Sequence, residues 1–296
     1  MKVGFIGLGQ MGKHMALNML KSGVELIVND VRTDSFEEFI SKGASTTTDL
    51  SEVAKADIIF LSLPDTKIVK SVLLGEKGLI KHLKKGQMVV DLSTITYTGT
   101  LEIAKRMEEQ DIAFVDAPVS GMEARAIDGT LTVMCGGAKE DFEKIKPFLE
   151  CIGNKILYMG DIGKGQLTKL INQLLFDINV AAVAEILPMA KKLGLDPVKV
   201  ADVVNSGTGR SYASEFFIPR IVKGEFSEGY SMDNAYKDLV SAAGISADLC
   251  VPLPVLHAAT TTYQMALLKG YGDCGKGAMI RVFEELLGVE YREDEK

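Results

Sequence analysis

The stretch that decides the fold is Met1–Asp30, MKVGFIGLGQMGKHMALNMLKSGVELIVND. Its first part, Lys2–Leu8, is a short apolar run of β-branched and aromatic residues, which predicts a buried strand. A helical pattern follows a glycine-rich turn, and a second apolar run, Val24–Val28, ends in Asn29-Asp30. The order strand, turn, helix, strand predicts a β-α-β unit.

Three glycines join the first strand to the helix in the pattern G-x-G-x-x-G, which is typical of a dinucleotide-binding turn. Gly7 would allow the tight turn, Gly9 would let the backbone approach a pyrophosphate, and Gly12 would let helix and strand pack closely. The pyrophosphate would bind at the positive end of the helix. We therefore predict that the whole turn contacts the cofactor: Gly7, Leu8, Gly9, Gln10, Met11 and Gly12.

The acidic residue at the end of the second strand indicates which dinucleotide binds. Asp30 lies 18 residues after Gly12, where a carboxylate accepts hydrogen bonds from the adenosine ribose and repels a 2′-phosphate. We therefore expect NAD (NADH), with NADP the weaker ligand. Arg32 follows two residues later and leaves an alternative open, because a guanidinium there would meet a phosphate.

Composition excludes several classes of protein. The 296 residues have a formal net charge of −7 and no block rich in Lys or Arg, so we expect no nucleic-acid partner. The longest apolar stretch, residues 174–190, is interrupted by polar residues and proline, so we expect a buried helix and no membrane partner. The four cysteines have no metal-ligand spacing, which predicts reduced thiols, a cytoplasmic protein and no metal site. They are Cys135, Cys151, Cys250 and Cys274.

The chain predicts two domains. Strand and helix patterns alternate as far as Lys155–Met159, which indicates an α/β, Rossmann-type, doubly wound parallel sheet in residues 1–163. Residues 164–296 read almost entirely as helix, so we expect an all-helical domain for substrate binding and oligomerisation. The charged end, Glu290–Lys296, is expected to fray.

The first helix of the second domain is expected to run from Gly163 to about Leu193. It is apolar on most sides, so it must be surrounded within its domain or by another subunit. We therefore expect a homodimer or homotetramer. Its first two turns carry Lys169, Asn172 and Gln173 on one side, and we expect these turns to line a cavity.

Five ordered motifs show that the chain resembles the β-hydroxyacid dehydrogenase family, which includes 3-hydroxyisobutyrate dehydrogenases and tartronate semialdehyde reductases. The first is the opening GFIGLGQMG. The others are Asp91-Leu-Ser-Thr-Ile95, Asp116-Ala-Pro-Val-Ser-Gly121 with Asp128-Gly-Thr-Leu-Thr132, Gly165-Gln-Leu-Thr-Lys-Leu-Ile-Asn-Gln173, and Tyr236-Lys-Asp-Leu239. The resemblance spans almost the whole chain. It implies an NAD-dependent oxidoreductase that interconverts a β-hydroxyacid and its semialdehyde.

Lys169 matches the catalytic lysine of that family. Oxidising an alcohol with NAD needs a base for the hydroxyl proton, and burial beside a positive nicotinamide ring would lower the pKa of a lysine toward neutrality. An arbitrary helical lysine would simply be exposed. The three histidines, His14, His82 and His257, stand outside every motif, so we expect them to be surface or packing residues.

The resemblance also implies the substrate-binding residues. Ser120 and the backbone N–H of Gly121 would bind the carboxylate, while Asn172 or Gln173 would add a side-chain amide and Asp238 would complete the pocket. Many relatives have glycine where this chain has Met122, so the side chain takes up space beside the carboxylate site. Many also have a second Asn at position 173, which leaves open whether Asn172 or Gln173 faces the substrate.

The remaining contacts implied for the cofactor come from three places. The strand-end residues Leu63 and Pro64 would lie near it, Ser93 and Thr94 would contact the nicotinamide ribose, and Lys237 would lie near the nicotinamide end.

Arg210 decides between two substrate classes. The stretch Gly209-Arg-Ser-Tyr-Ala213 resembles that of 2-(hydroxymethyl)glutarate dehydrogenase, and a guanidinium in the pocket suits a second carboxylate. If Arg210 is a surface charge instead, a small monoanionic hydroxyacid is expected. Arg125 is a second candidate for a distal anion.

Two other functions remain as alternatives. One is an imine reductase of the same superfamily. Imine reductases usually replace the catalytic lysine, so the presence of Lys169 disfavours this alternative. A non-catalytic NAD-binding protein would have no need for the lysine and the carboxylate-loop motif.

Overall fold

The computed structural model describes residues 1–293, so the expectation for residues 294–296 lies outside the described residues. The chain divides into two compact units, Met1–Lys169 and Leu170–Lys296. This division falls inside one continuous helix, α8 (Lys164–Lys192), whereas the sequence analysis divided the chain just before that helix.

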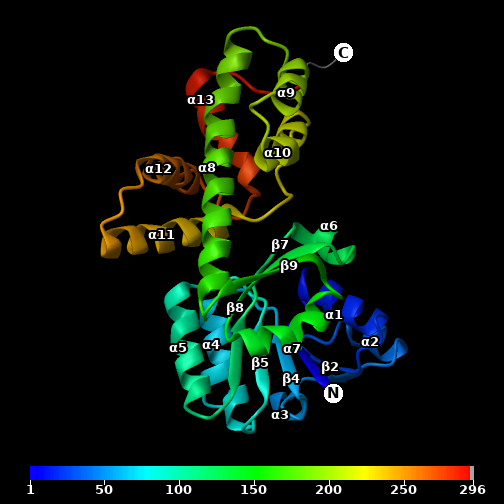
Figure 1. Ribbon diagram of the computed structural model, residues 1–296. Helices are drawn as coiled ribbons and strands as arrows, with labels where there is room; N and C mark the ends of the chain where they lie inside the picture. The colour runs from blue at the N-terminus through cyan, green and yellow to red at the C-terminus, as the bar shows by residue number, and fades with distance from the viewer. Residues whose placement is uncertain (294–296) are drawn as a thin grey trace. The chain divides into compact units, whose positions relative to one another are not determined.

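The first unit is built on a nine-stranded sheet (Figure 1). Its strands are β1 (Val3–Ile6), β2 (Leu26–Asn29), β3 (Ser45–Thr47), β4 (Ile58–Leu61), β5 (Met88–Asp91), β6 (Ala113–Asp116), β7 (Val119–Ser120), β8 (Leu131–Gly136) and β9 (Gly153–Gly160). They lie in the order β3-β2-β1-β4-β5-β6-β8-β7, with β9 paired to β8. The strand order reverses at β1, and such reversals are where open α/β sheets bind their ligands.

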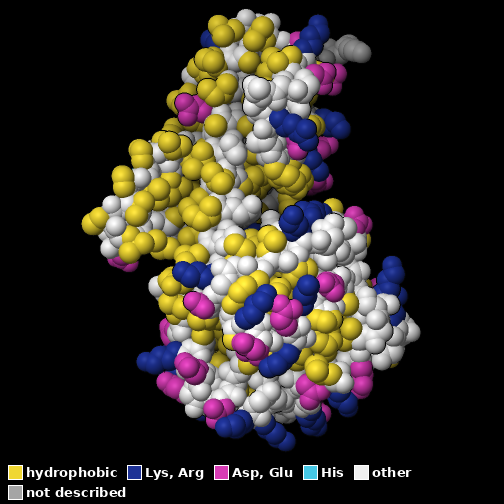
Figure 2. All heavy atoms as spheres, in the orientation of Figure 1, with side chains coloured by type: hydrophobic (Ala, Val, Ile, Leu, Met, Phe, Trp, Pro, Cys, Tyr) yellow, Lys and Arg dark blue, Asp and Glu magenta, His cyan; other side chains and the backbone are white. Residues whose placement is uncertain are grey.

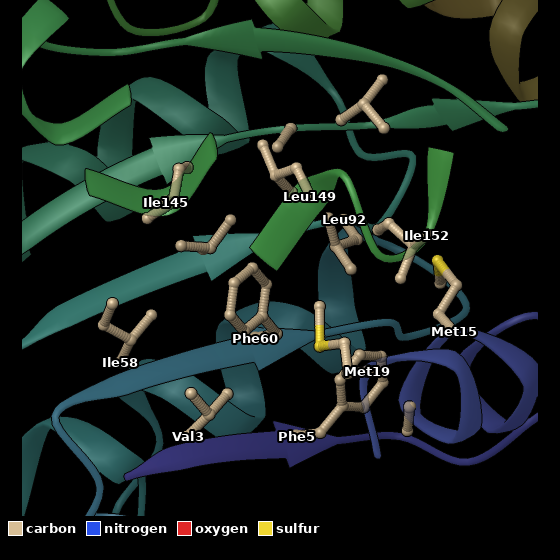
Figure 3. Close-up of a cluster of buried hydrophobic side chains, with 14 of the residues drawn as sticks. Val3, Phe5, Met15, Met19, Ile58, Phe60, Leu92, Ile145, Leu149 and Ile152 are labelled. Carbon is tan, nitrogen blue, oxygen red and sulfur yellow. The ribbon is translucent and has the colours of Figure 1, made fainter. Parts of the chain in front are cut away.

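Helices pack on both faces of this sheet. They are α1 (Gly12–Lys21), α2 (Phe36–Ser41), α3 (Leu50–Val53), α4 (Thr66–Leu74), the 3-10 helix η1 (Leu79–Lys81), α5 (Tyr97–Glu108), α6 (Met122–Ile127) and α7 (Lys139–Leu149). Successive strand residues point to opposite faces, so each strand contributes to two cores. On one face, Phe5 and Phe60 stack with ring centroids 6.4 Å apart, beneath side chains of α1 and α7 (Figure 3). The predicted doubly wound fold is confirmed.

One part of the sheet differs from the parallel arrangement that the sequence predicted. Strands β1 to β6 are parallel, but β8 runs antiparallel to both β6 and β7. The segment between β6 and β8 contains the two-residue strand β7, which itself pairs antiparallel with β8, and antiparallel neighbours need only a short return. A buried apolar run such as Leu131–Cys135 carries no sign of direction, so the sequence could not show this reversal.

The second unit is helical between residues 170 and 293. Besides most of α8 it contains α9 (Pro197–Ser206), α10 (Tyr212–Val222), α11 (Met232–Leu249), α12 (Pro254–Leu268), the 3-10 helix η2 (Lys276–Met279) and α13 (Ile280–Leu287). These helices enclose a separate apolar core. Inside it the carboxylate of Asp177 pairs with the ammonium group of Lys276 and accepts a hydrogen bond from the Tyr263 hydroxyl (O···O 3.1 Å). Both charged side chains are fully buried.

The end of the second unit is ordered where the sequence predicted fraying. Tyr291 is fully buried and its hydroxyl donates to the carbonyl oxygen of Pro197. The Glu284 carboxylate accepts bonds from the backbone N–H of Tyr291 and from the Arg292 guanidinium. The expectation for residues 290–293 was therefore wrong, because one buried aromatic residue fixes this charged segment.

By length and composition alone, α8 is apolar enough to cross a membrane, with a mean hydropathy of 1.5 over its most apolar window. A core helix passes the same test, so this property is weak support for a membrane span. Only 33% of that window is buried within the single chain.

Candidate functional site

The glycine turn has the geometry that a dinucleotide requires. Gly7 has φ +95°, and a Cβ atom there would lie 2.2 Å from the carbonyl oxygen of Ser62. A Cβ at Gly12 would lie 2.0 Å from the carbonyl oxygen of Gly7, whereas one at Gly9 would have no atom within 4 Å. The turn is therefore closed on the protein side and open at its middle glycine, which fits a pyrophosphate approaching the backbone.

Asp30 lies at the end of β2 and is fixed by the turn itself. Its carboxylate accepts hydrogen bonds from the backbone N–H of Leu8 (N···O 2.7 Å) and of Arg32 (N···O 2.9 Å). It borders a cavity of about 210 Å³ that is lined by Leu8, Lys13, Asp30, Arg32, Asp34 and Ser35. Both signs of charge line this cavity.

The ends of β4 and β5 are joined at Ser93. The backbone N–H of Leu63 donates to the Ser93 hydroxyl (N···O 2.9 Å), and the N–H of Ser93 donates to Oδ1 of Asp91 (N···O 2.9 Å). Ser93 is buried, Thr94 is half-buried and Pro64 is exposed. The cofactor residues predicted here, Leu63, Pro64, Ser93 and Thr94, thus lie at two neighbouring strand ends next to the turn.

Two carboxyl groups are buried at the same edge of the sheet. Asp91 ends β5 and Asp116 ends β6, and both side chains are fully buried. Burial, and to a smaller degree the neighbouring Asp116, raise the pKa of Asp91 to about 7, although hydrogen bonds from Ser93 act in the opposite direction. Burial also raises the pKa of Asp116 to about 6, although backbone N–H donors act in the opposite direction.

Asp116 holds the beginning of α8. Its carboxylate accepts hydrogen bonds from the backbone N–H of Gly163 (N···O 2.6 Å) and of Gln166 (N···O 2.8 Å). A carboxylate in this position satisfies N–H groups that the first helical turn leaves unpaired, and it interacts favourably with the helix dipole. Lys169 follows one turn after Gln166, and only 8% of it is exposed.

The predicted carboxylate loop is a sharp turn between β7 and α6. Gly121 has φ +144° and Met122 has φ +60°, so two successive residues lie in the region that favours glycine. The helix that follows packs on α1, where Asn18 donates to the carbonyl oxygen of Ala126 (N···O 2.8 Å). Ser120, Gly121 and Met122 are half-buried.

The remaining predicted residues belong to the second unit and differ in environment. Gln173 is half-buried and its amide donates to Asp238 (N···O 3.4 Å), whereas Asn172 is exposed. Lys237 is exposed on α11, where its ammonium group donates to Asn234 (N···O 2.8 Å).

The two arginines considered for a distal anion have protein partners. Arg210 is exposed and forms an ion pair with Glu215 (N···O 2.6 Å). Arg125 donates to the carbonyl oxygen of Thr130. Among residues 1–293, no group of three or more His, Cys, Asp or Glu side chains has the arrangement of a metal site.

Sequence reasoning gave no role to Asp91, Asp116 or Gln166, although each lies in a motif that it quoted. An acidic residue at the end of an apolar strand is a visible signal, and Asp91 and Asp116 both end such strands. The contacts of Gln166 reach 71 and 73 residues back along the chain, and no local pattern indicates them.

Comparison with known proteins covers both units. Residues 2–160 match the family described as the NAD binding domain of 6-phosphogluconate dehydrogenase. Residues 163–283 match the family described as NAD-binding of NADP-dependent 3-hydroxyisobutyrate dehydrogenase. The chain therefore contains a match to each of these two domain families, one after the other.

Individual relatives match over nearly their full length. The chain is 40% identical to 2-(hydroxymethyl)glutarate dehydrogenase of Eubacterium barkeri, over 97% of this chain and 96% of the relative. It is 36% identical to 2-hydroxy-3-oxopropionate reductase of Escherichia coli, over 96% and 97%.

Solved structures agree with these relatives. The 3-hydroxyisobutyrate dehydrogenase of Salmonella typhimurium has a TM-score of 0.87 and 29% identity, over 95% of this chain and 99% of that one. A protein named Psf3, solved in complex with NADP+, has a TM-score of 0.84 and 27% identity, over 95% and 99%.

Proposed function

Because the chain belongs to the β-hydroxyacid dehydrogenase family and is an NAD(P)-dependent oxidoreductase, we propose that it interconverts a β-hydroxyacid and its semialdehyde with Lys169 as the general acid and base. The observation that carries this proposal is the burial of Lys169 on the first turns of α8. One turn before it, Gln166 is hydrogen-bonded to Asp116 at the end of β6 and to Ser93 after β5.

Lys169 would move the proton. In the reductive direction its ammonium group donates a proton to the carbonyl oxygen of the semialdehyde as that carbon accepts a hydride, which gives the alcohol. In the oxidative direction its neutral amine accepts the hydroxyl proton. When bound, the dinucleotide supplies or accepts the hydride.

The substrate carboxylate would bind Ser120 and the backbone N–H of Gly121. These donors do not titrate near neutral pH, so they hold the carboxylate without competing for the proton that Lys169 transfers. Of the two amides considered, we propose Gln173, because it is half-buried whereas Asn172 is exposed, and because it lies on the same side of α8 as Lys169. Its bond to Asp238 would orient the amide. Asn172 is the alternative.

The dinucleotide would be held by the glycine turn, by Leu63, Pro64, Ser93 and Thr94, and by Asp30. We propose NAD rather than NADP, because the Asp30 carboxylate, fixed by two backbone N–H groups, would meet a 2′-phosphate with its negative charge. Arg32 borders the same cavity, and its guanidinium would pair with a 2′-phosphate, so we expect residual activity with NADPH. Comparing kcat/KM for NADH and NADPH tests this choice.

Two substrate classes remain, and they differ in the number of carboxylates. The ion pair between Arg210 and Glu215 favours a small monoanion, because it occupies the guanidinium. The similarity to a 2-(hydroxymethyl)glutarate dehydrogenase favours a dianion. An NADH-linked screen of tartronate semialdehyde, succinic semialdehyde, methylmalonate semialdehyde and 2-formylglutarate separates the two classes.

The Lys169→Ala variant tests the proposed chemistry. We expect it to bind NADH with little change and to lose at least about 10³-fold in kcat. The matched control is Lys164→Ala, which removes an exposed lysine from the same helix and should leave kcat within about twofold. Unchanged turnover in the Lys169→Ala variant would refute the assignment of the general acid and base.

We also propose that the protein forms a homodimer or homotetramer in the cytoplasm through its helical domain. Figure 2 shows hydrophobic side chains gathered over α11, α12 and α8 of the second unit. The large exposed apolar residues of these three helices include Ile171, Leu175, Ile186, Met189, Val240 and Val255. An apolar surface of this kind marks an association site in a protein that does not aggregate. A monomer by light scattering at micromolar concentration would contradict this proposal.

A further inference from the structure

We propose that Gln166 is a positioning residue. By joining α8 to the loop after β5, it fixes the position of Lys169 along the α8 axis and its rotation about that axis. The inference rests on the proposed function of Lys169 and adds a requirement for it. All of the contacts that carry it lie within the first unit.

Every hydrogen-bonding atom of the Gln166 side chain has a buried partner. Its Nε2 donates to the carbonyl oxygen of Ser93 (N···O 2.7 Å), and its Oε1 accepts from the backbone N–H of Ile95 (N···O 3.2 Å). Only 2% of Gln166 is exposed. A side chain that is desolvated and fully bonded in this way is held in one conformation.

The backbone of Gln166 is fixed as well. Its N–H donates to Asp116, whose other carboxylate oxygen accepts from Gly163. The hydroxyl of Ser93 in turn accepts from Leu63. Buried hydrogen bonds thus connect the ends of β4, β5 and β6 with the first turn of α8.

Lys169 lies three residues after Gln166, which is about 4.5 Å along the helix axis and close to the same side of it. A shift of α8 at Gln166 is therefore passed on almost undiminished to the Lys169 ammonium group. A displacement of about 1 Å at a reacting group can cost about 100-fold in rate.

The chemistry of the contact requires an amide. One end of the side chain must donate to a carbonyl and the other must accept from an N–H, and a neutral amide does both. A leucine of similar size does neither. An ionised glutamate would place one carboxylate oxygen against the Ser93 carbonyl and would add charge near Asp116, whereas a protonated glutamate donates to that carbonyl.

The first test is the Gln166→Leu variant, measured in the direction of semialdehyde reduction. We expect kcat to fall about 10- to 100-fold, while the Kd for NADH changes less than about threefold. The control is Gln110→Leu, which changes an exposed glutamine after α5 and should leave kcat within about twofold. A folded Gln166→Leu protein with wild-type kcat would overturn the proposal, and so would a loss that appears only in NADH affinity.

The second test is the pH profile of Gln166→Glu. We expect its kcat relative to wild type to rise at least about tenfold between pH 8 and pH 5.5, because protonation restores the missing donor. A ratio that stays constant over this pH range would overturn the proposal.

A double-variant cycle separates this inference from the proposed function. If Gln166 acts through Lys169, adding Gln166→Leu to Lys169→Ala should reduce the residual rate less than about threefold. Equal losses in both backgrounds would refute the positioning role while leaving Lys169 as the acid and base. High activity of Lys169→Ala alone would refute the proposed function itself.

Discussion

The side chains of Asp91 and Asp116 are both fully buried at neighbouring strand ends, where the parallel register pairs the two residues directly. Asp116 is held by backbone N–H groups at the start of α8. Asp91 accepts a bond from Ser93 through Oδ1, whereas Oδ2 is buried and has no hydrogen-bond partner among the described residues. Asp116 therefore stabilises the start of α8 with both of its carboxylate oxygens, whereas within residues 1–293 Asp91 uses only one of its two oxygens in a hydrogen bond.

Stability should fall as the pH rises through the range in which these groups ionise. The raised pKa values of Asp91 (about 7) and Asp116 (about 6) mean that the folded protein binds more protons than the unfolded chain above pH 4. The free energy of unfolding therefore decreases between about pH 4 and pH 7. For Asp91 the full contribution is about 4 kcal/mol at most. Asp91→Asn should be more stable than wild type at pH 8 and equal to it near pH 4 in urea titrations.

The exposed residue Asp248 provides the control for that experiment, because Asp248→Asn removes a carboxylate that stays solvated. Its stability should parallel wild type at every pH. An Asp91→Asn protein with the same pH slope as wild type would show that Asp91 ionises normally.

Gly9→Ala should separate cofactor binding from folding. The added methyl group meets no protein atom, so stability should change by less than about 1 kcal/mol. It would stand where the pyrophosphate approaches, and we expect the Kd for NADH to rise at least about tenfold. Gly244→Ala on α11 is the control, because it also adds a methyl group in open space and should leave NADH titrations unchanged. Equal Kd values for all three proteins would contradict the cofactor site.

Met122→Gly should relieve backbone strain at the carboxylate loop. A residue with a Cβ atom costs about 1 kcal/mol at φ +60°, so the glycine variant should gain roughly 0.5–1 kcal/mol in thermal unfolding. Met122→Ala keeps the Cβ atom and should gain nothing. Both variants remove the long side chain, so both should lower KM for the bulkier semialdehydes. A lower KM in Met122→Gly alone would assign the effect to the backbone and not to the side chain.

Lys276→Met should destabilise the helical unit strongly. The substitution removes the buried ammonium group that pairs with the fully buried carboxylate of Asp177, and breaking such a pair typically costs about 3–5 kcal/mol. Lys269→Met is the matched control, because it breaks an ion pair with Glu285 that is about half exposed and should cost less than about 1 kcal/mol. Chemical unfolding monitored by circular dichroism measures both, and equal costs would contradict the role of burial.

The sequence predicted those features that short segments determine. Gly7, Gly9, Gly12 and Asp30 lie within one β-α-β unit, and their local geometry follows from backbone sterics that any such unit obeys. The long helix α8 was predicted almost to the residue, because its apolar pattern runs through many turns. The predicted reaction, in contrast, came from the resemblance to the β-hydroxyacid dehydrogenase family and not from these local patterns.

Contacts between distant segments were not predicted. β7 has two residues and α6 has six, so neither carries a periodic pattern. The buried place of Tyr291 depends on the carbonyl group of Pro197, which is 94 residues away. The bonds of Gln166 have the same character. Periodicity describes a segment, whereas these features depend on which segments meet.

The passage of the chain from one unit to the other through uninterrupted α8 has a practical consequence. The boundary contains no extended segment that a protease could cleave, because every residue from Lys164 to Lys192 is helical. Limited digestion should therefore fail to release two intact units, and expressing either unit alone would cut α8 within its second turn. The enzyme is best engineered as a single piece, with grafts and insertions directed to its surface loops.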